Sequence, residues 1–348
     1  MKALRYLEIG KPPVLVDIPQ PTAGPGQVVL KVTASGVCHS DQHVMSLPET
    51  EYRRRKYPLP LTLGHEGAGV VHEIGEGANT SLQIGDAVAV YGPWGCGHCH
   101  NCSMGRENYC TSAASLGLRP PGLGNQGAMA EYMLIDDPRH LVHLGNLDPV
   151  KNVSLTDAGL TPYHAIKGSA VKLGAGSYAV VIGTGGLGHL AVQILKAVTA
   201  ATVIALDISE ASLQLARDVG ADLAMISDTD AAAKIREYTG GIGANAVFDF
   251  VGAAPTIPLA IAVAAPEADV VIVGAGGGDV TFGFGSIAYD VAVRIPYWGY
   301  RNELIEVLDL ARAGKISVET TTYSLEDAAT AYLDLAAGSI RGRAVIVP

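Results

Sequence analysis

The chain has 348 residues, of which 48% are hydrophobic and 17% are charged. This length predicts two domains, because a single hydrophobic core rarely grows so large. A net charge of −10 argues against nucleic acid or an anionic membrane surface as the partner. The stretch MKALRYLEIGKPP lacks the apolar core of a signal peptide, and no apolar run approaches the roughly 18 residues of a membrane helix.

Residues 1–153 are predicted to form a β-rich, barrel-like domain. Short apolar or alternating runs at 28–37, 68–75 and 86–92 are typical of strands, and clusters of Gly, Pro, Asn and Ser separate them as turns. Helix-like stretches are scarce in this part of the chain. The basic run RRRK at 53–56 is expected to be a solvated surface loop.

Residues 154–295 alternate between strand-like apolar runs and amphipathic helix-like runs, which is typical of a parallel, doubly wound sheet of the α/β class. The predicted strands are 178–183, 202–208, 246–252 and 268–276, and the predicted helices are 189–198, 209–220 and 230–240. The last segment, 296–348, carries a predicted helix at 302–314 and a final strand at 343–348. Its pattern does not assign it to either domain.

A glycine-rich turn, GTGGLG at 183–188, lies between a predicted strand and a predicted helix. Such a turn lets the backbone approach a pyrophosphate at a helix N-terminus, where free N–H groups favour anions. Asp207 ends the next strand, where its carboxylate can bind ribose hydroxyls and repel a 2′-phosphate. No Lys or Arg follows at 208–210, so the sequence predicts NAD rather than NADP. The alternative is a structural turn without a ligand. The predicted cofactor residues are Gly183, Gly185, Gly186, Leu187, Gly188 and Asp207.

Four of the five cysteines lie in the loop 95–111, at a spacing that can complete the tetrahedral shell of a structural zinc ion. The rival is an iron–sulfur cluster, but a ferredoxin-type run places its fourth Cys after three residues and before Pro, whereas here the gap is seven and Thr111 follows. His98 and His100 are expected to face solvent, although either can replace a thiolate. Clustered thiolates indicate a reduced, cytoplasmic enzyme. The predicted ligands are Cys96, Cys99, Cys102 and Cys110.

A second set of metal-binding residue types is dispersed along the chain, as Cys38, His65, Glu66 and Asp157. A thiolate, an imidazole and a carboxylate can form a three-ligand zinc site with an open position, which is the arrangement of catalytic zinc. Taken singly, a lone Cys is usually a small buried hydrophobic residue, and a lone His is usually a hydrogen-bonded core residue. Spacing alone does not establish that these residues meet.

These motifs, in this order and at these separations, resemble the medium-chain zinc-dependent alcohol dehydrogenases along essentially the whole chain. GHEGAGVVHEIGEGA at 64–78 resembles the family's zinc signature, and the resemblance is greatest to bacterial NAD-dependent secondary-alcohol dehydrogenases used as carbonyl reductases. It implies a GroES-like catalytic domain over 1–153, an NAD-binding Rossmann domain over 154–295, and a segment 296–348 that returns to complete the catalytic domain. The closer resemblance is carried by YGPWGCGHCHNCSMGRENYC, LTDAGLTPYHAI, PYWG and GSIRGRAVIVP.

The resemblance also implies roles for individual residues. Cys38, His65 and Asp157 match the catalytic zinc ligands, although many members have a second Cys at the third position. Glu66 matches a carboxylate that approaches the metal during ligand exchange, and Asp41 matches the carboxylate that orients His65. The residues at cofactor-contacting positions are His39 and Arg341, beside the pyrophosphate, and Thr161, beside the nicotinamide.

The implied activity is reversible hydride transfer between NAD(H) and a secondary or primary alcohol and its ketone or aldehyde, with two zinc ions per chain. Ser40 and His43 are expected to relay the alcohol proton to water, and Trp298 is expected to line an apolar substrate pocket. We expect a homodimer or homotetramer that binds neither nucleic acid nor membrane. Two alternatives remain: a zinc-free, quinone-reductase-like enzyme of the same superfamily, which would lack both ligand sets, and a non-enzymatic metal-binding or redox-cluster protein.

Overall fold

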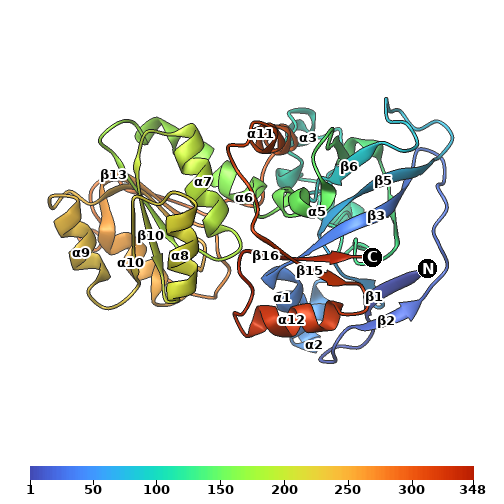
Figure 1. Cartoon of the computed structure of the whole chain (residues 1–348), viewed down its shortest axis with the longest axis horizontal. Coiled ribbons are helices and arrows are strands. Elements are labelled where there is room, and N and C mark those ends of the chain that lie inside the picture. The colour runs from blue at the N-terminus through green and yellow to red at the C-terminus, as the bar shows by residue number, and fades with distance from the viewer. The chain divides into compact units, whose positions relative to one another are not determined.

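The computed structural model describes all 348 residues, which divide into two units (Figure 1). The first unit comprises Met1–Asp157, Tyr300–Arg312 and Ser317–Pro348, and the second comprises Ala158–Gly299 and Ala313–Ile316. The first boundary lies beyond residue 153 because the 3₁₀ helix η3 (Val153–Thr156) packs against strands of the first unit. The second lies at Gly299 rather than at 295. No helix combines the length and the apolar character that crossing a membrane would need.

The first unit is built on two sheets, and its long strand β3 is central to the larger one. β3 pairs with β5, β7 and β16, all in antiparallel orientation. The larger sheet has the order β15-β16-β3-β5-β6-β8, with β7 also on β3, and the smaller has the order β2-β1-β4. The strands are β1 (Lys2–Tyr6), β2 (Val14–Asp17), β3 (Val28–Val37), β4 (Leu61–Thr62), β5 (Glu66–Ile74), β6 (Ala87–Val90), β7 (Tyr132–Ile135), β8 (Leu141–His143), β15 (Thr320–Ser324) and β16 (Arg343–Val347).

Short helices connect these strands, and the sequence analysis predicted only the one that corresponds to 302–314. The helices of the first unit are α1 (His39–Ser46), α2 (Glu49–Arg54), α3 (His100–Ser103), α4 (Ala113–Leu116), α5 (Pro149–Asn152), α11 (Arg301–Arg312) and α12 (Ala328–Ala336), with the 3₁₀ helices η1 (Glu107–Tyr109), η2 (Pro138–His140) and η3. The basic run at 53–56 was expected in a loop, but its first half ends α2. Acidic residues in the first turn and basic residues in the last complement the helix dipole. Arg53 and Arg54 are exposed, as expected.

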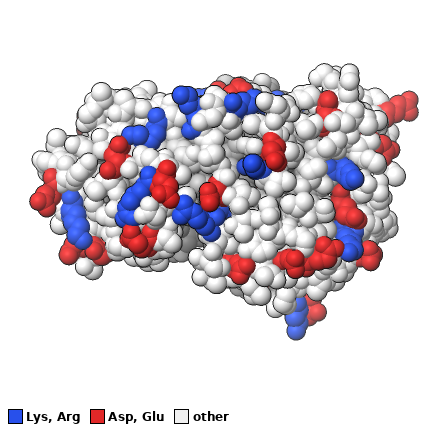
Figure 2. Space-filling view, in the orientation of Figure 1, with Lys and Arg blue, Asp and Glu red and all other residues white.

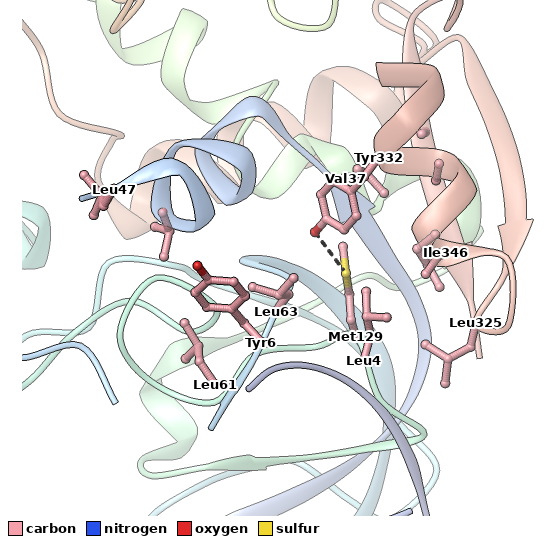
Figure 3. Packing of buried hydrophobic residues seen from close by; sticks show 14 of the residues in the cluster. Leu4, Tyr6, Val37, Leu47, Leu61, Leu63, Met129, Leu325, Tyr332 and Ile346 are labelled. Carbon is pink, nitrogen blue, oxygen red and sulfur yellow. Dashed lines mark hydrogen bonds between the residues drawn. The ribbon is translucent and has the colours of Figure 1, made fainter. Parts of the chain in front are cut away.

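Most of the carboxyl-terminal segment 296–348 belongs to the first unit, except 296–299 and 313–316. Its last strand, β16, lies beside β3, with Ala344 opposite Val37 and Ile346 opposite Ser35. α12 packs over the same region as α1, and both contribute to one buried apolar cluster (Figures 1 and 3). The labelled members of that cluster are Leu4, Tyr6, Val37, Leu47, Leu61, Leu63, Met129, Leu325, Tyr332 and Ile346.

The second unit confirms the predicted parallel, doubly wound sheet. All of its strand pairs are parallel, in the order β11-β10-β9-β12-β13-β14, which is the Rossmann order. Its strands are β9 (Tyr178–Ile182), β10 (Thr202–Asp207), β11 (Leu223–Ile226), β12 (Ala244–Asp249), β13 (Ala264–Ile272) and β14 (Ala292–Arg294). Its helices are α6 (Leu160–Lys167), α7 (Gly188–Val198), α8 (Glu210–Asp218), α9 (Ala231–Tyr238) and α10 (Thr256–Val263), with the 3₁₀ helix η4 (Ala170–Lys172).

Five elements of this unit were not predicted, namely α6, η4, β11, α10 and β14. β11 and β14 are too short to show a clear period, and α10 is an almost continuous apolar run without an amphipathic pattern. Figure 1 shows α7 and α8 on one side of the sheet and α9 and α10 on the other. The face drawn in Figure 2 carries basic and acidic side chains interspersed, with no large area of one sign.

Candidate functional site

Four potential metal ligands from separate parts of the sequence meet in the first unit. Cys38 directly follows β3, His65 and Glu66 lie at the start of β5, and Asp157 directly follows η3. One donor atom from each lies within 4.8 Å of the others. The pairing of β3 with β5 and the packing of η3 against both strands produce this cluster. The structure therefore brings together the dispersed residues that the sequence analysis could not join by spacing.

The distances within this cluster fit a tetrahedral zinc ion. Ligand bonds of about 2.0–2.3 Å place two tetrahedral ligands about 3.3–3.8 Å apart. His65 Nε2 lies 3.4 Å from Asp157 Oδ2, and Cys38 Sγ lies 3.9 Å from the same oxygen. The Asp157 side chain is 13% exposed, whereas that of His65 is 1% exposed. The cluster is thus buried on the imidazole side and reachable from solvent on the Asp157 side.

Asp41 is hydrogen-bonded to the His65 ring, which is the contact that its predicted orienting role requires. His65 Nδ1 lies 2.8 Å from Asp41 Oδ1, and since a carboxylate only accepts, Nδ1 carries the donated proton and Nε2 faces the cluster. Burial lowers the pKa of His65, but the Asp41 and Asp157 carboxylates outweigh it and raise that pKa well above its usual range. The site therefore favours positive charge, which a bound divalent cation would also supply.

Glu66 is fully buried beside this cluster and depends on a glycine for its space. Gly36 lies opposite Glu66 in the β3–β5 pairing, and a Cβ at Gly36 would lie 1.7 Å from Glu66 Oε2. That oxygen has no hydrogen-bond partner, whereas Oε1 accepts a hydrogen bond from Arg343. Burial raises the pKa of Glu66, and the Arg343 guanidinium opposes that shift.

Arg343 is a site residue that the sequence analysis missed. It begins β16 and is only 3% exposed, although it is a charged residue. The signal was present in the sequence, since an arginine opens the apolar strand RAVIV. A buried arginine needs a partner, and the structure shows that the partner is Glu66.

The four clustered cysteines also converge. Cys96 Sγ lies 3.9 Å from Cys102 Sγ, and Cys99 Sγ lies 3.9 Å from Cys110 Sγ. Tetrahedral Zn–S bonds of about 2.3 Å would separate the sulfur atoms by about 3.8 Å. None of the cysteines is in a disulfide. His98 and His100 are exposed and lie outside the group of converging donor atoms. These residues fit a structural zinc ion.

Backbone N–H groups favour thiolates in this loop. Those of Cys102 and Thr111 lower the pKa of the Cys99 thiol to about 5. The backbone N–H groups of His98 and Cys99 lower the pKa of Cys96. Burial raises the pKa of the Cys102 thiol. Cys96 and Cys99 therefore favour the thiolate, which is the metal-binding form of cysteine, before a cation binds.

The residues considered for a proton relay lie on α1 beside Cys38. Ser40 Oγ is 3.7 Å from Cys38 Sγ. His43 is exposed and follows Ser40 by three residues, a spacing that places both on one face of the helix. His39, at the start of the same helix, is also exposed.

The glycine motif of the second unit has a geometry that explains each of its three spaced glycines. Gly183 has φ +83°, so it makes a turn that L side chains rarely adopt. A Cβ at Gly188 would lie 1.9 Å from the Gly183 carbonyl oxygen, so the helix approaches the strand closely. A Cβ at Gly185 would meet nothing within 4 Å. The backbone at Gly185 is therefore open to a ligand, as a dinucleotide fold requires.

Asp207 ends β10 beside this turn, as expected. Its Oδ2 accepts hydrogen bonds from Thr184 N at 2.7 Å and Thr184 Oγ1 at 3.2 Å, and its Oδ1 accepts one from Ser209 N at 2.9 Å. The carboxylate is only half-buried. It is thus held in place and remains accessible to a ligand hydroxyl.

Three other expected site residues do not belong to either group of converging donor atoms. Thr161 is buried on α6, in the second unit. Trp298 is 6% exposed and has φ +55°, an uncommon conformation for a bulky residue. Arg341 lies in the first unit, where its Nε is 3.4 Å from Glu319 Oε1 and both side chains are about half-exposed.

Comparison with known proteins identifies relatives over the whole chain. Residues 24–146 match the alcohol dehydrogenase GroES-like domain, and residues 186–313 match the zinc-binding dehydrogenase domain. The chain is 37% identical to an NAD-dependent alcohol dehydrogenase from Sulfurisphaera tokodaii over 356 aligned positions that cover 100% of each protein.

Solved structures agree with these matches. The alcohol dehydrogenase from Aeropyrum pernix superposes with a TM-score of 0.91, at 34% identity and with 100% of each chain covered. An acetophenone reductase from Geotrichum candidum, solved in complex with NAD, superposes with a TM-score of 0.86 at 32% identity, covering 100% of this chain and 97% of that one.

Proposed function

This chain belongs to the medium-chain, zinc-type alcohol dehydrogenase family, and we propose that it interconverts an alcohol and its ketone or aldehyde with NAD(H) as the second substrate. The observation that carries this proposal is the convergence of Cys38, His65, Glu66 and Asp157. A structural sheet would not need a thiolate, an imidazole and two carboxylates within 4.8 Å of one another. A zinc-free quinone-reductase-like enzyme would have no use for either of the two donor clusters.

We assign the two donor clusters to two zinc ions per chain. Cys38, His65 and Asp157 would hold the catalytic ion, with Glu66 as the carboxylate that can approach it. Three ligands leave an open position for substrate, whereas four thiolates close the shell of a structural ion. The structural ligands are accordingly Cys96, Cys99, Cys102 and Cys110. Because thiolate ligands persist in a reducing compartment, we place the enzyme in the cytoplasm.

The chemistry divides between the bound groups and the side chains of this chain. A zinc ion supplies Lewis acidity to the alcohol oxygen, and NAD supplies the hydride acceptor. Ser40 accepts the alcohol proton as it gives up its own hydroxyl proton towards His43, since a hydroxyl can accept and donate hydrogen bonds at once. His43 then passes the proton to water, and its exposed position on α1 supports that role. Asp41 keeps the His65 ring in the orientation that the ion requires.

We propose NAD rather than NADP as the cofactor. Gly183, Gly185 and Gly188 would admit the pyrophosphate, and the Asp207 carboxylate would bind the adenosine ribose and repel a 2′-phosphate. The neighbouring Gly186 and Leu187 would add backbone N–H groups at the start of α7. We further assign His39 and Arg341 to the pyrophosphate and Thr161 to the nicotinamide. Both the NAD-dependent relative and the acetophenone reductase bound to NAD are consistent with this choice.

For the substrate, we propose secondary alcohols and bulky or aromatic ketones, with Trp298 contacting their apolar part. The acetophenone reductase supports this class. An NADH-oxidation screen over small ketones, aryl ketones and aldehydes tests the proposal, and turnover of none of them would overturn it. Trp298→Ala should change the preference for ketone size without abolishing turnover of the smallest ketones. An unchanged preference would remove Trp298 from the pocket.

We also propose that the chain forms a homodimer or homotetramer. β14 is an edge strand of the six-stranded sheet, and large apolar side chains lie exposed near it in the sequence. Phe284 is 100% exposed, Tyr289 is 70% exposed and Ile295 is 78% exposed. Exposed apolar groups beside an unpaired strand edge favour association with a second copy.

A further inference from the structure

Asp41 is a fully buried carboxylate that accepts hydrogen bonds from three donors. The Cys38 N–H donates to Oδ2 at 3.2 Å, and His65 Nδ1–H donates to Oδ1 at 2.8 Å. Both donors belong to residues of the metal cluster. The third is the Tyr332 hydroxyl, which donates to Oδ2 at 3.0 Å from a position 291 residues further along the chain.

Tyr332 is held at both its side chain and its backbone. Gln42, the neighbour of Asp41 on α1, donates its Nε2–H to the Tyr332 carbonyl oxygen at 2.9 Å. The ring is buried in the apolar cluster between α1 and α12, where its hydroxyl also lies 3.2 Å from Met129 Sδ (Figure 3). Two separate bonds thus connect α12 to the helix that carries Asp41.

The single hydroxyl proton of Tyr332 goes to Asp41, because a carboxylate is a far stronger acceptor than a thioether sulfur. Burial and the Asp41 charge both raise the pKa of Tyr332 well above its usual range, so the phenol remains a donor. Without this hydroxyl, Asp41 Oδ2 would keep only the Cys38 N–H. A buried carboxylate with an unmet acceptor is costly, and its side chain would rotate or admit water.

We propose that Tyr332 is a positioning residue of the metal centre, which acts by fixing the Asp41 carboxylate and, through it, the His65 ring. The inference rests on the zinc assignment in the proposed function. Partners of a metal-ligating histidine set its tautomer and ring orientation. The carboxyl-terminal segment therefore supports the metal centre through α12 as well as completing the sheet through β16.

Tyr332→Phe removes only the hydroxyl and has a matched control. Tyr52 belongs to the same buried cluster, and its hydroxyl donates to the Pro58 carbonyl oxygen at 3.0 Å, away from Asp41. Tyr52→Phe therefore deletes one tyrosine hydroxyl from the same apolar cluster without affecting the proposed chain. Purified wild-type protein and both variants are mixed with a chromogenic chelator, and the two phases of zinc release are timed.

We expect Tyr332→Phe to release the catalytic-site zinc about tenfold faster, at the lower end of the 10–100-fold effects seen when a direct partner of a ligand is removed. Release from the four-cysteine loop should be unchanged, and Tyr52→Phe should match the wild type in both phases. If each chain releases two zinc ions and the release rates of Tyr332→Phe equal those of Tyr52→Phe, the role of Tyr332 is overturned and the zinc assignment stands. A wild-type chain that releases only one zinc would overturn the zinc assignment, and the Tyr332 role with it.

A double-variant comparison separates positioning from simple packing. Asp41→Asn alters the acceptor through which Tyr332 is proposed to act. If that route is correct, Tyr332→Phe adds little to the release rate of Asp41→Asn, because the chain is already broken. Effects that multiply independently would show that Tyr332 acts by packing, and would overturn the proposal.

Discussion

At the scale of single residues, the cluster of potential metal ligands depends on the absence of a side chain at Gly36. Glu66 can lie beside Cys38, His65 and Asp157 only because Gly36 has no side chain. Gly36 has no positive φ that would itself require glycine, so the requirement comes from space alone. A residue without functional groups thereby helps to shape the site.

Gly36→Ala should lower both activity and stability. The new methyl group would overlap the Glu66 carboxylate, and overpacking of this kind costs about 1–3 kcal/mol. The midpoint temperature of thermal unfolding should fall by about 2–10 °C on that basis. The value of kcat/KM should also fall, because Glu66 is displaced. Gly174→Ala is the control, since a Cβ there meets nothing within 4 Å. If the two variants behave alike, the space at Gly36 is not what matters.

His43→Gln should slow alcohol oxidation most at low pH, where fewer solvent bases are available to take the proton. Small-molecule buffer bases should partly restore the rate. Ser40→Ala should be more damaging, since an external base does not reach the inner oxygen. The measurement is the pH profile of kcat under conditions where chemistry limits turnover, with His72→Gln as an exposed control. An unchanged pH profile of kcat would remove His43 from the proton relay.

Asp207→Gly should narrow the preference of the enzyme for NADH over NADPH, mainly through the KM for NADH. The reason is the loss of ribose hydrogen bonds together with the loss of repulsion toward a 2′-phosphate. Asp207→Asn separates the two effects, because it removes the charge and keeps one acceptor oxygen. Comparable kcat/KM values for the two cofactors in the wild type would contradict the role given to Asp207.

At the scale of elements, a polar network centred on the Glu107 carboxylate stabilises the four-cysteine loop. Glu107 accepts a hydrogen bond from Gly95 N at 2.9 Å, and Arg139 and His140 reach the same carboxylate. The His140 ring stacks on Trp94, with ring centroids 4.8 Å apart. Glu107 thus connects the start of the loop, at Gly95, to Arg139 and His140 outside it.

Cys99→Ser should remove one zinc ion per chain and destabilise the protein. Elemental analysis should find two ions per chain in the wild type and one in the variant. A cross-link that closes a loop of about 15 residues contributes about 3 kcal/mol to the free energy of unfolding. We therefore expect the midpoint temperature of thermal unfolding to fall by about 5–10 °C. Catalytic turnover should survive at permissive temperature. A wild-type value near one, with the loop metal-free, would contradict the structural assignment.

At the scale of the whole molecule, the proposed association surface and the two metal clusters belong to different units. The edge strand β14 and its exposed apolar neighbours belong to the second unit, whereas the metal clusters belong to the first. Association through β14 and its neighbours would therefore not use any of the metal-cluster residues as contacts.

Ile295→Lys should weaken self-association, because it places a charge beside β14. Sedimentation velocity over a range of concentrations measures the effect, and the average mass should fall towards that of one chain. Ile84→Lys is the matched control: Ile84 is 70% exposed, similar to the 78% of Ile295, but it lies in the first unit. Equal masses for both variants and the wild type would remove β14 from the interface.

The sequence by itself determined the features that are local. The turn at 183–188 and the loop 95–111 place their functional groups within a few residues, so spacing and the special properties of Gly and Cys sufficed to recognise them. The strand at 28–37 coincides with β3 because its apolar pattern is long and unambiguous. The family resemblance then implied which dispersed residues act together.

Only the tertiary structure decided the contacts that join distant parts of the chain. Pairing of β3 with β5 makes Gly36 a neighbour of Glu66, and pairing of β16 with β3 brings Arg343 to that carboxylate. The bond from Tyr332 to Asp41 likewise spans most of the chain. No period or motif encodes such contacts, because they arise from the register of separate strands and from helix packing that settles only when the core closes.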